Sequence, residues 1–408
     1  MEYKTIKDLD VSGKRVLVRV EFNVKLNKGE VGDDTRIKES LPTLKYLLEK
    51  NARLILLAHL GRPQDELSGG KSVEDVKKDN SLAPVAKHLS GLLGMDVKMA
   101  PDSVGDEVRT MVNELKDGGV LLLENLRLYK EELDNDCEFA KTLASYGDIF
   151  VFDGFGVAHR VQASPVGVPL EMIAQGKEVA AGLLMDKELR LWEEARKKEG
   201  HRLLVIGGKK LNEKVKAVGN LYKAVDSVLV GGAVYNIIIA GKGIAVGDSL
   251  IEEKGKDYTG KGKELSGEVG NLLLAKRVVI AKKGDFSDYR EISVDDGVPN
   301  GYMITDIVID DDIKAEIEKA QVVIWFGNIG ISDAEVNGAH PFAKGTEDFK
   351  KTVSKNAYVI VGGGDSITAS EGLANSVIST GGGAAIALYT TGTLDALEAL
   401  KGNKDYFN

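Results

Sequence analysis

Four apolar segments in the first half of the chain are each followed by arginine or histidine side chains. The pairs are Asn23 with Arg36, His59 with Arg62, Glu124 with Arg127, and His159 with Arg160. Arginine presents a planar fork of donors that suits phosphate and carboxylate oxygens. One such pair alone often has only a structural role. Four strands that are each followed by a cationic side chain, however, predict a shared anion-binding site. Eight of the 13 arginines lie before residue 172, which assigns this site to the first half.

The second half instead places glycines directly after its apolar segments. They are Gly207, Gly208, Gly231, Gly232, Gly327, Gly362, Gly363, Gly364, Gly381, Gly382 and Gly383. Ligands of doubly wound folds bind beyond the carboxyl ends of strands, where glycine lets the backbone approach a phosphate closely. Lys210 and Lys214 share one helix face beside these glycines, although a solvated helix face has the same spacing. The pattern predicts a nucleotide site.

Asp365 and Ser366 directly follow three of these glycines. A loop that ends in a helix-capping Asp would show the same residues. Beside a phosphate site, however, a carboxylate in this position is a natural ligand for Mg²⁺. Both interpretations remain open from the residues alone.

The sequence contains neither a complete P-loop motif nor G-x-G-x-x-G. Residues 255–261 fit the spacing G-x-x-x-x-G-K, but Gly262 stands where Ser or Thr is required and no buried strand precedes them. We interpret this match as chance. The absence of both motifs argues against a P-loop NTPase and against a standard NAD dehydrogenase.

The composition excludes further classes of protein. The 408 residues carry 54 Lys and Arg against 63 Asp and Glu, a net charge of −9 that argues against general nucleic-acid binding. Cys137 is the single cysteine, which excludes an intrachain disulfide and favours a reducing cytoplasm. No cationic segment with an apolar stretch follows Met1, so we expect no secretory leader, and no apolar run approaches the about 20 residues that span a bilayer. We expect a cytoplasmic monomer without nucleic-acid or membrane partners.

Apolar strand-like runs alternate with helical patterns along the whole chain. The runs occupy residues 16–20, 54–58, 120–123, 149–152, 203–206, 227–230, 322–325 and 358–361. They are continuous rather than alternating, as in parallel strands covered on both faces. Helical patterns occur at 41–50, 81–93 and 212–224, and Ser81 and Asn212 are candidate caps. This order predicts an α/β fold with two doubly wound, Rossmann-like domains built on parallel sheets.

Residues 179–200 form an amphipathic, helix-like segment between the two series of strands. We predict a phosphate-binding domain over residues 1–178, an interdomain helix over 179–200, a nucleotide-binding domain over 201–390 and a C-terminal segment over 391–408. One more surface helix would show the same pattern as the interdomain helix.

The ordered set of motifs resembles the phosphoglycerate kinase family from about residue 16 to residue 400. The matching segments are VLVRVEFNV, DDTRI, AHLGRP, LLLENLRLYKEE, FDGFGVAHR, GG-K-K, VGGA, IWFGNIG, GGGDS and STGGGA. The resemblance implies that the first domain binds phosphoglycerate and the second binds MgADP or MgATP. It also implies reversible phosphoryl transfer between 1,3-bisphosphoglycerate and MgADP, with Mg²⁺ as the metal.

The resemblance implies roles for individual residues. Acid binding is implied for Glu21, Asn23, Arg36, His59, Arg62, Arg127, His159 and Arg160. Nucleotide binding is implied for Gly208, Lys210, Lys214, Gly231, Gly232, Gly327, Asn328, Asp333, Gly363, Gly364, Asp365 and Ser366. The implied catalytic set is Arg36, Lys210, Gly364 and Gly382, and Asp365 is the implied ligand of Mg²⁺.

The chain departs from the family pattern at several of these positions. Glu21 replaces the usual Asp, and Phe326 and Asn328 replace the Asn and Pro of Trp-Asn-Gly-Pro. Asp333 or Glu335 would have to replace the Glu that binds the ribose. Two alternatives therefore remain open. Glu21, with Phe152 and Gly154, suggests a kinase of the same fold for another phosphorylated acid, whereas Phe326 and Asn328 suggest a non-catalytic nucleotide-binding homologue.

Overall fold

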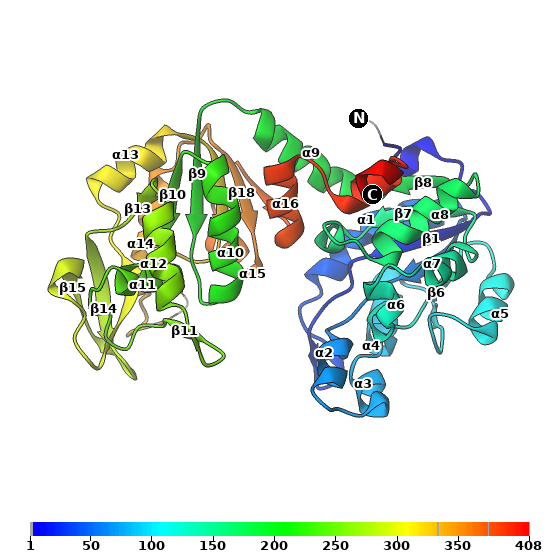
Figure 1. Cartoon of the computed structure of the whole chain (residues 1–408), viewed down its shortest axis with the longest axis horizontal. Helices are drawn as coiled ribbons and strands as arrows, with labels where there is room; N and C mark the ends of the chain where they lie inside the picture. Colours follow the sequence, from blue (N-terminus) through cyan, green and yellow to red (C-terminus); the bar gives the residue numbers. More distant parts are fainter. Residues whose placement is uncertain (1–2, 333, 374, 408) are drawn as a thin grey trace. The chain divides into compact units, whose positions relative to one another are not determined.

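The computed structural model describes residues 3–332, 334–373 and 375–407, and at Gly364 and Asp365 it describes the backbone alone. The chain forms two compact units: unit 1 comprises Met1–Arg190 with Thr391–Asn408, and unit 2 comprises Leu191–Thr390 (Figure 1). Each unit contains a six-stranded parallel sheet, which confirms the prediction of two doubly wound α/β domains. No described helix is both long and apolar enough to cross a membrane.

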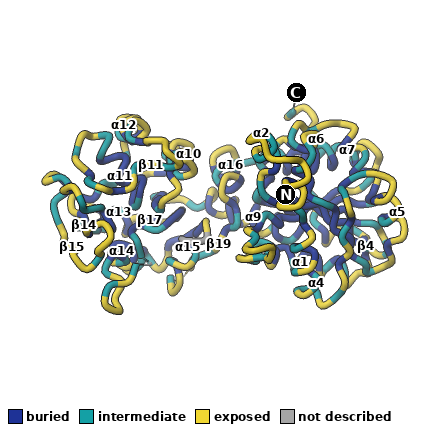
Figure 2. The backbone as a smooth tube through the Cα atoms, turned by 90° about the horizontal axis from the view of Figure 1, so that it is seen from below, coloured by how far each residue is buried: buried dark blue, intermediate teal, exposed yellow. Residues whose placement is uncertain are grey.

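The sheet of unit 1 has the strand order β5-β6-β4-β1-β7-β8. Its strands are β1 (Arg15–Val20), β4 (Arg53–Leu57), β5 (Val97–Met99), β6 (Val120–Leu122), β7 (Ile149–Asp153) and β8 (Glu178–Ala181). Val16 of β1 lies opposite Leu54 of β4 and Ile149 of β7. Every residue of β1 after Arg15 is buried, so both faces of this strand are covered. Most of the neighbouring strand β4 is buried as well (Figure 2).

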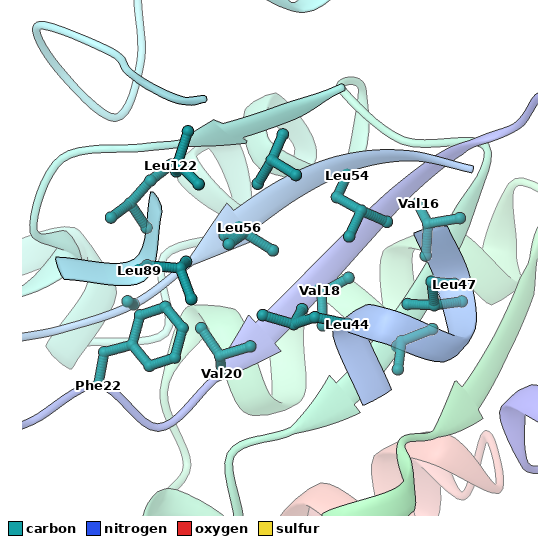
Figure 3. Close-up of a cluster of buried hydrophobic side chains, with 14 of the residues drawn as sticks. Val16, Val18, Val20, Phe22, Leu44, Leu47, Leu54, Leu56, Leu89 and Leu122 are labelled. Carbon is teal, nitrogen blue, oxygen red and sulfur yellow. The ribbon is translucent and has the colours of Figure 1, made fainter. Parts of the chain in front are cut away.

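Helices and short turns complete unit 1. The helices are α1 (Thr35–Glu49), α2 (Pro63–Ser68), α3 (Val73–Asp79), α4 (Ala83–Leu93), α5 (Asp106–Glu114), α6 (Lys130–Leu133), α7 (Cys137–Ala144), α8 (Val168–Ala174) and α17 (Asp395–Leu400). The turns used below are η2 (Leu126–Leu128), η3 (Phe155–Val157) and η4 (Ala163–Gly167). Leu44 and Leu47 of α1 pack with Val16 and Val18 of β1 in one buried cluster (Figure 3).

The first helix begins earlier than the predicted span of 41–50. Ile37 is fully buried and continues the apolar spacing that leads to Leu44, so the helix extends back by more than a turn. Pro42 therefore lies inside α1 rather than near its start. Arg36 belongs to the first turn of α1 and not to the segment before the helix.

The sheet of unit 2 has the strand order β13-β10-β9-β17-β18-β19. Its strands are β9 (His201–Ile206), β10 (Ser227–Val230), β13 (Leu272–Leu273), β17 (Ala320–Phe326), β18 (Tyr358–Gly362) and β19 (Ser376–Ser379). Its helices are α10 (Leu211–Leu221), α11 (Gly232–Gly241), α12 (Thr259–Glu268), α13 (Asp311–Lys319), α14 (Lys344–Thr352), α15 (Gly364–Ala369) and α16 (Gly383–Thr391). The eight predicted strands are confirmed as β1, β4, β6, β7, β9, β10, β17 and β18.

Unit 2 also contains an antiparallel sheet that the sequence did not predict. It has the order β15-β14-β16, from β14 (Arg277–Lys282), β15 (Asp285–Ser293) and β16 (Tyr302–Ile307). Most of β15 is exposed and polar, so it carries no apolar strand pattern. Phe286 and Tyr289 nevertheless contact the buried ring of Phe342, with centroids 5.6 and 5.5 Å apart, which anchors this strand.

The chance match to a P-loop motif lies on a hairpin and a helix. Residues 255–261 run from the hairpin of β11 (Glu252–Glu253) and β12 (Lys256–Asp257) into α12. A Cβ at Gly262 would lie 1.8 Å from the carbonyl oxygen of Ile237, so this glycine lets α12 pack closely on α11. Close helix packing, rather than phosphate binding, explains the residue.

Of the two predicted caps, Ser81 accepts through Oγ from the amide of Ala83 at the start of α4 at 3.2 Å, as predicted, whereas Asn212 lies inside α10 and does not cap it. Helix α4 begins after Ser81, whose hydroxyl donates to the carboxylate of Glu124 at 2.7 Å, and Glu124 also accepts from Leu82 N at 2.8 Å. Helix α10 begins before Asn212, whose amide donates to Glu253 at 2.7 Å. In both cases a carboxylate that is remote in sequence accepts from an amide near the start of the helix. The local sequence around the helix start does not reveal such a partner.

The chain passes from unit 1 to unit 2 within α9 (Leu183–Lys197). The helix expected over 179–200 is shorter because the residues up to Ala181 extend β8 and because the helix ends at Lys197. The segment 391–408 packs with unit 1, where the amide of Ala396 donates to the carbonyl of Ala158 at 2.9 Å.

Side chains of unit 1 hold the start of α9. The donors are Leu183 N to Thr43 Oγ1 at 2.9 Å, and Leu184 N and Met185 N to Asp153 Oδ1 at 3.0 and 3.3 Å. Amides at a helix start have no partner within the helix, so these bonds replace a local cap. A Cβ at Gly182 would lie 2.1 Å from Asp153 Oδ1, so only glycine leaves room for this carboxylate.

We expect Asp153→Asn to flatten the pH dependence of unfolding. Burial raises the pKa of Asp153 to about 7, from an ordinary value of 3.8. As the pH rises between these values, the unfolded chain loses a proton that the folded chain keeps, so the native carboxyl lowers stability progressively. Asn keeps an acceptor for the α9 amides and does not titrate.

The measurement is the urea midpoint of both proteins as a function of pH. The midpoint of the wild type should fall relative to that of Asp153→Asn as the pH rises toward neutrality, and parallel profiles would contradict the assignment. Asp153→Ala, which also removes the acceptor, should cost about 1–2 kcal/mol more than the Asn variant.

Candidate functional site

The residues predicted to bind an anion lie at one edge of the unit 1 sheet. They follow the carboxyl ends of four adjacent strands, β6, β4, β1 and β7. Glu21 and Asn23 follow β1, His59 and Arg62 follow β4, Arg127 lies in η2 after β6, and His159 and Arg160 follow η3 after β7. Parallel pairing therefore gathers side chains that lie far apart in the sequence.

Arg36 is held toward this edge by the residues that follow β1. Its Nη1 donates to Glu21 Oε1 at 2.8 Å and to the carbonyl of Asn23 at 3.2 Å. Asn23 Oδ1 accepts from the amide of Gly61 at 3.0 Å, and Arg127 Nη1 donates to the carbonyl of Gly61 at 2.9 Å. These bonds connect the segments that follow three strands and orient two guanidinium groups before any ligand binds.

Three buried polar atoms in the described part of this cluster have no hydrogen-bond partner. They are Glu21 Oε2, His159 Nδ1 and Arg160 Nε. Most buried polar groups in folded proteins are paired, so a cluster of unpaired ones indicates a place for a polar ligand. Glu21 Oε2 can accept from a hydroxyl, and Arg160 Nε can donate to an anionic oxygen.

A fifth arginine, Arg19, belongs to the cluster and was not predicted. It lies within β1 and is 1% exposed. Its Nη2 lies 2.9 Å from His59 Nδ1, and its Nε donates to Ser164 Oγ at 2.7 Å. The available signal was a charged residue inside an apolar strand, since a buried charge requires buried partners.

Both histidines of the cluster are neutral near neutral pH. Burial, followed by the field of Arg19, lowers the pKa of His59 well below its usual 6.5. Burial and the neighbouring Arg160 lower the pKa of His159 to about 4. Burial also lowers the pKa of Arg127 to about 10, which leaves this group charged at neutral pH. The arginines therefore carry the positive charge of the site.

Arg62 lies at the rim of the cluster. Its side chain is 76% exposed, and its nearest carboxylate, on Asp65, is 3.8 Å away. An exposed pair of this kind contributes little stability, so the guanidinium can turn toward a ligand at small cost.

The glycines predicted to bind a nucleotide lie where four adjacent strands of unit 2 end. Gly231 and Gly232 follow β10, Gly207 and Gly208 follow β9, Gly327 follows β17, and Gly363 and Gly364 follow β18. The sheet thus gathers the backbone of four turns at its carboxyl edge, as the anion cluster is gathered in unit 1.

These glycines pack backbone against backbone. A Cβ at Gly207 would lie 2.1 Å from the carbonyl oxygen of Asn328, and one at Gly327 would lie 2.1 Å from that of Gly207. A Cβ at Gly232, where φ is +52°, would lie 2.6 Å from the amide nitrogen of Gly208. Gly208 N in turn donates to the carbonyl of Asn328 at 2.8 Å. The fold itself excludes side chains here, in addition to any need of a ligand.

Lys210 and Lys214 lie at the start of α10, beside these turns. Lys210 directly precedes the helix, and its carbonyl accepts from the amide of Lys214 at 3.1 Å. The Lys214 ammonium lies 5.7 Å from the centre of the Phe326 ring, within the range of a cation–π contact. A Cβ at Gly362 would lie 2.2 Å from that ring, so the glycine that ends β18 makes room for Phe326.

Two further predicted nucleotide contacts have partners within the protein. The Ser366 hydroxyl is buried, donates to the carbonyl of Gly362 at 3.0 Å and accepts from the amide of Gly327. It stabilises the turns after β17 and β18, because both of its bonds go to backbone groups. Asn328 Nδ2 donates to Ser332 Oγ at 2.9 Å, which fixes the side chain that replaces the usual proline.

The other predicted positions are described to different extents. Gly363, with φ +92°, precedes α15, in which Gly364 is the first residue and Asp365 the second. Gly382 precedes α16, and no atom lies within 4 Å of a Cβ built there. Asp333 lies outside the described residues, and Glu335 is exposed.

Comparisons with known proteins identify the family. A family model described as Phosphoglycerate kinase matches residues 6–391. The chain belongs to the phosphoglycerate kinase family. Phosphoglycerate kinase from Moorella thermoacetica is 39% identical over 405 residues, which cover 97% of this chain and 98% of that protein. Phosphoglycerate kinase from Dictyoglomus turgidum is 41% identical over 404 residues, which cover 95% and 96%.

Solved structures agree with this assignment. The phosphoglycerate kinase of Coxiella burnetii superimposes with a TM-score of 0.74 at 31% identity, and that of Pyrococcus horikoshii with 0.76 at 28%. Each alignment covers 98% of this chain and 99% of the other. Family membership thus rests on sequence and fold alike, and the resemblance inferred from the motifs is confirmed.

Because both histidines are already neutral, we expect anion affinity in unit 1 to be nearly independent of pH. Sulfate is a suitable probe, since its charge is constant over the range in which an ordinary histidine titrates, about pH 5.5 to 8. Its dissociation constant, measured by calorimetry at fixed ionic strength, should change by less than about twofold, because the arginines stay charged. Arg160→Gln should weaken binding by a similar factor at every pH. A tenfold loss of affinity between the acid and alkaline ends would show that a histidine carries charge in the free site.

Proposed function

We propose that this chain transfers a phosphoryl group reversibly between 1,3-bisphosphoglycerate and MgADP, giving 3-phosphoglycerate and MgATP, a step of glycolysis and gluconeogenesis. The arginine cluster at four adjacent strand ends of unit 1 is the observation that carries the proposal. A ligand with a phosphate at one end and a carboxylate at the other matches a site with several guanidinium groups. The family assignment supports the same reaction.

The reaction needs no general base from the protein. The nucleophile is a terminal phosphate oxygen of ADP in one direction and a carboxylate in the other, and both are ionised near neutral pH. Neutral histidines, with a depressed pKa, agree with this requirement because neither has to remove a proton. Catalysis then rests on alignment for in-line transfer and on cations near the equatorial oxygens.

Arg36 and Lys210 are the proposed catalytic cations. Arg36 is half-exposed at 43% and is held by Glu21, whose second oxygen has no partner and can accept from the hydroxyl of phosphoglycerate. Lys210 precedes α10 beside the glycine turns, where the nucleotide phosphates would lie. Because the two cations belong to different units, we infer that transfer requires domain closure on both substrates, which also excludes water.

Mg²⁺ is proposed to enter with the nucleotide and to be held by Asp365. One carboxylate after a turn of three glycines suits this ion, which usually keeps several waters and takes its other ligands from substrate phosphates. The backbone supports the assignment, since Gly363 has φ +92° and Asp365 follows one residue into α15. When bound, the ion neutralises charge on the phosphates.

The alternatives receive little support from the structure. Phe152, which suggested another acid substrate, is fully buried in β7 beside Arg19, so its ring belongs to the core. Phe326 contacts Lys214 and leaves the glycine turns intact. The presence of this residue is therefore compatible with a catalytic protein and does not require a homologue that only binds nucleotide. We infer a cytoplasmic monomer, in keeping with a glycolytic enzyme.

The decisive assay couples the conversion of 3-phosphoglycerate and MgATP by the purified chain to a spectroscopic readout. We expect saturable turnover, and Arg36→Ala and Lys210→Ala should each lower kcat by about 100-fold or more, because each removes a cation aimed at the transferred group. Lys45→Ala on α1 and Lys216→Ala on α10 are matched controls, since both side chains are exposed outside the clusters. No turnover in a protein that still binds MgATP by calorimetry would refute the proposed reaction.

A second experiment tests the magnesium ligand. Asp365→Asn should weaken binding of MgATP by about tenfold while leaving the affinity for magnesium-free ATP within about twofold, since only the carboxylate–metal bond is lost. Glu371→Gln, at an exposed position just after α15, is the control. Because Gly363 rather than Asp365 occupies the capping position of α15, the interpretation of Asp365 as a helix cap is wrong, and equal affinities of wild type and Asp365→Asn for MgATP would show that Asp365 does not bind the metal.

A further inference from the structure

Arg19 is a buried cation, and each of the three nitrogens of its guanidinium group contacts a protein group. Its Nε donates to Ser164 Oγ at 2.7 Å, its Nη1 donates to the carbonyl of Val20, and its Nη2 lies 2.9 Å from His59 Nδ1. Arg19 and His59 are each 1% exposed. The side chain is therefore placed to act through His59 rather than to bind a substrate itself.

The contact with His59 has one chemical interpretation. A guanidinium carries only donors and keeps its charge, so the ring nitrogen that faces it has to accept. Nδ1 of His59 consequently carries no proton. A neutral imidazole holds its single proton on the other nitrogen, Nε2, which leaves that N–H as the donor that His59 can offer.

A buried carboxylate keeps Arg19 in this position. Ser164 Oγ, which accepts from Arg19, donates to Glu132 Oε1 at 2.6 Å, and Ser164 N donates to Glu132 Oε2 at 2.9 Å. Glu132 is 1% exposed, so the two opposite charges offset each other in the core. The result is a chain of bonds from α6 through η4 and β1 to the histidine after β4.

The charges around His59 explain why a neutral imidazole suits this site. Arg36 of α1, Arg127 of η2 and Arg160 after β7 all act on His59 together with Arg19, while Glu21 and Glu132 act on Arg19. A charged imidazole would add one more cation to this group. A neutral ring instead adds a directed hydrogen-bond donor without further repulsion between cations.

We propose that Arg19 is a positioning residue that holds His59 as the neutral Nε2–H tautomer, so that His59 donates one uncharged hydrogen bond to an anionic oxygen of the acid substrate. The first half of this inference concerns the free protein, and the second half rests on the proposed binding of phosphoglycerate.

The first test is NMR of the full ligand-free chain labelled with ¹⁵N-histidine. Long-range ¹H–¹⁵N correlations report which ring nitrogen carries the proton, and the His59 signals are identified by their loss in His59→Gln or His59→Asn. We expect a protonated Nε2 and an unprotonated Nδ1 from neutral pH down to about pH 5.5. A protonated Nδ1, a mixture of tautomers or an imidazolium would overturn the inference, whether or not the chain turns over substrate.

The double variant Arg19→Met/Glu132→Gln tests the cause of the tautomer. It removes both buried charges together, so no unpaired charge is left in the core. We expect His59 to show a mixture of tautomers in this variant and an unchanged single tautomer in the control Arg109→Met, which alters an exposed arginine of α5. A single Nε2–H tautomer in the double variant would show that Arg19 does not impose it.

Two substitutions of His59 separate its two nitrogens. Gln can place a donor near the position of Nε2, whereas the shorter Asn reaches only the position of Nδ1, where its Oδ1 can accept from Arg19. By calorimetry, His59→Asn should bind 3-phosphoglycerate about fivefold more weakly, the usual effect of one neutral hydrogen bond, and His59→Gln should recover most of the loss. His201→Gln, in unit 2, is the control. Equal affinities of the Asn and Gln variants would contradict a donor role for Nε2. If the chain shows no turnover but the Asn and Gln variants still differ in affinity as expected, the result would count only against the proposed kinase reaction.

Discussion

Parallel strand pairing is the constraint on which the rest of this structure depends. In the six-stranded sheet of each unit the strands run in one direction, so every carboxyl end reaches the same edge of that sheet. Residues as distant in the chain as Glu21, His59 and Arg160 meet there without any local sequence signal for their contact. In unit 2 the same edge gathers glycine turns instead, and close backbone packing leaves no room for side chains at Gly207, Gly232 and Gly327. The difference between the two sites is therefore one of turn residues, not of fold.

Gathering arginines at one edge carries an electrostatic cost that the surroundings reduce. Glu132 offsets the buried charge of Arg19, and Glu21 pairs with Arg36 at 2.8 Å. The two histidines contribute no charge near neutral pH because burial and the neighbouring arginines depress the pKa of each. The remaining positive charge is available to a ligand, so an anion bound as proposed would relieve the repulsion between these cations.

The departures from the family pattern have local physical explanations. Glu21 is one methylene longer than the usual Asp and reaches Arg36 directly, while Gly156 leaves the space that its carboxylate occupies. Phe326 lies against Gly362 and under the ammonium of Lys214, so an apolar ring replaces an amide without displacing the lysine. Glu21 and Phe326 therefore change the groups that orient Arg36 and Lys214, while both of these cations are retained.

The sequence by itself determined eight strands of the two parallel sheets, the two doubly wound domains and most of the cations at the strand ends, because continuous apolar runs and the residues that follow them are local features. It did not reveal the early start of α1, the antiparallel strand β15 or the caps supplied by Glu124 and Glu253, since each depends on partners remote in the chain. The place of Arg19 and the backbone contacts that require Gly207 and Gly327 were likewise decided by tertiary structure. The sequence shows which side chains are present. Only tertiary packing decides which ring nitrogen of His59 faces the guanidinium of Arg19 and which one is left for a ligand.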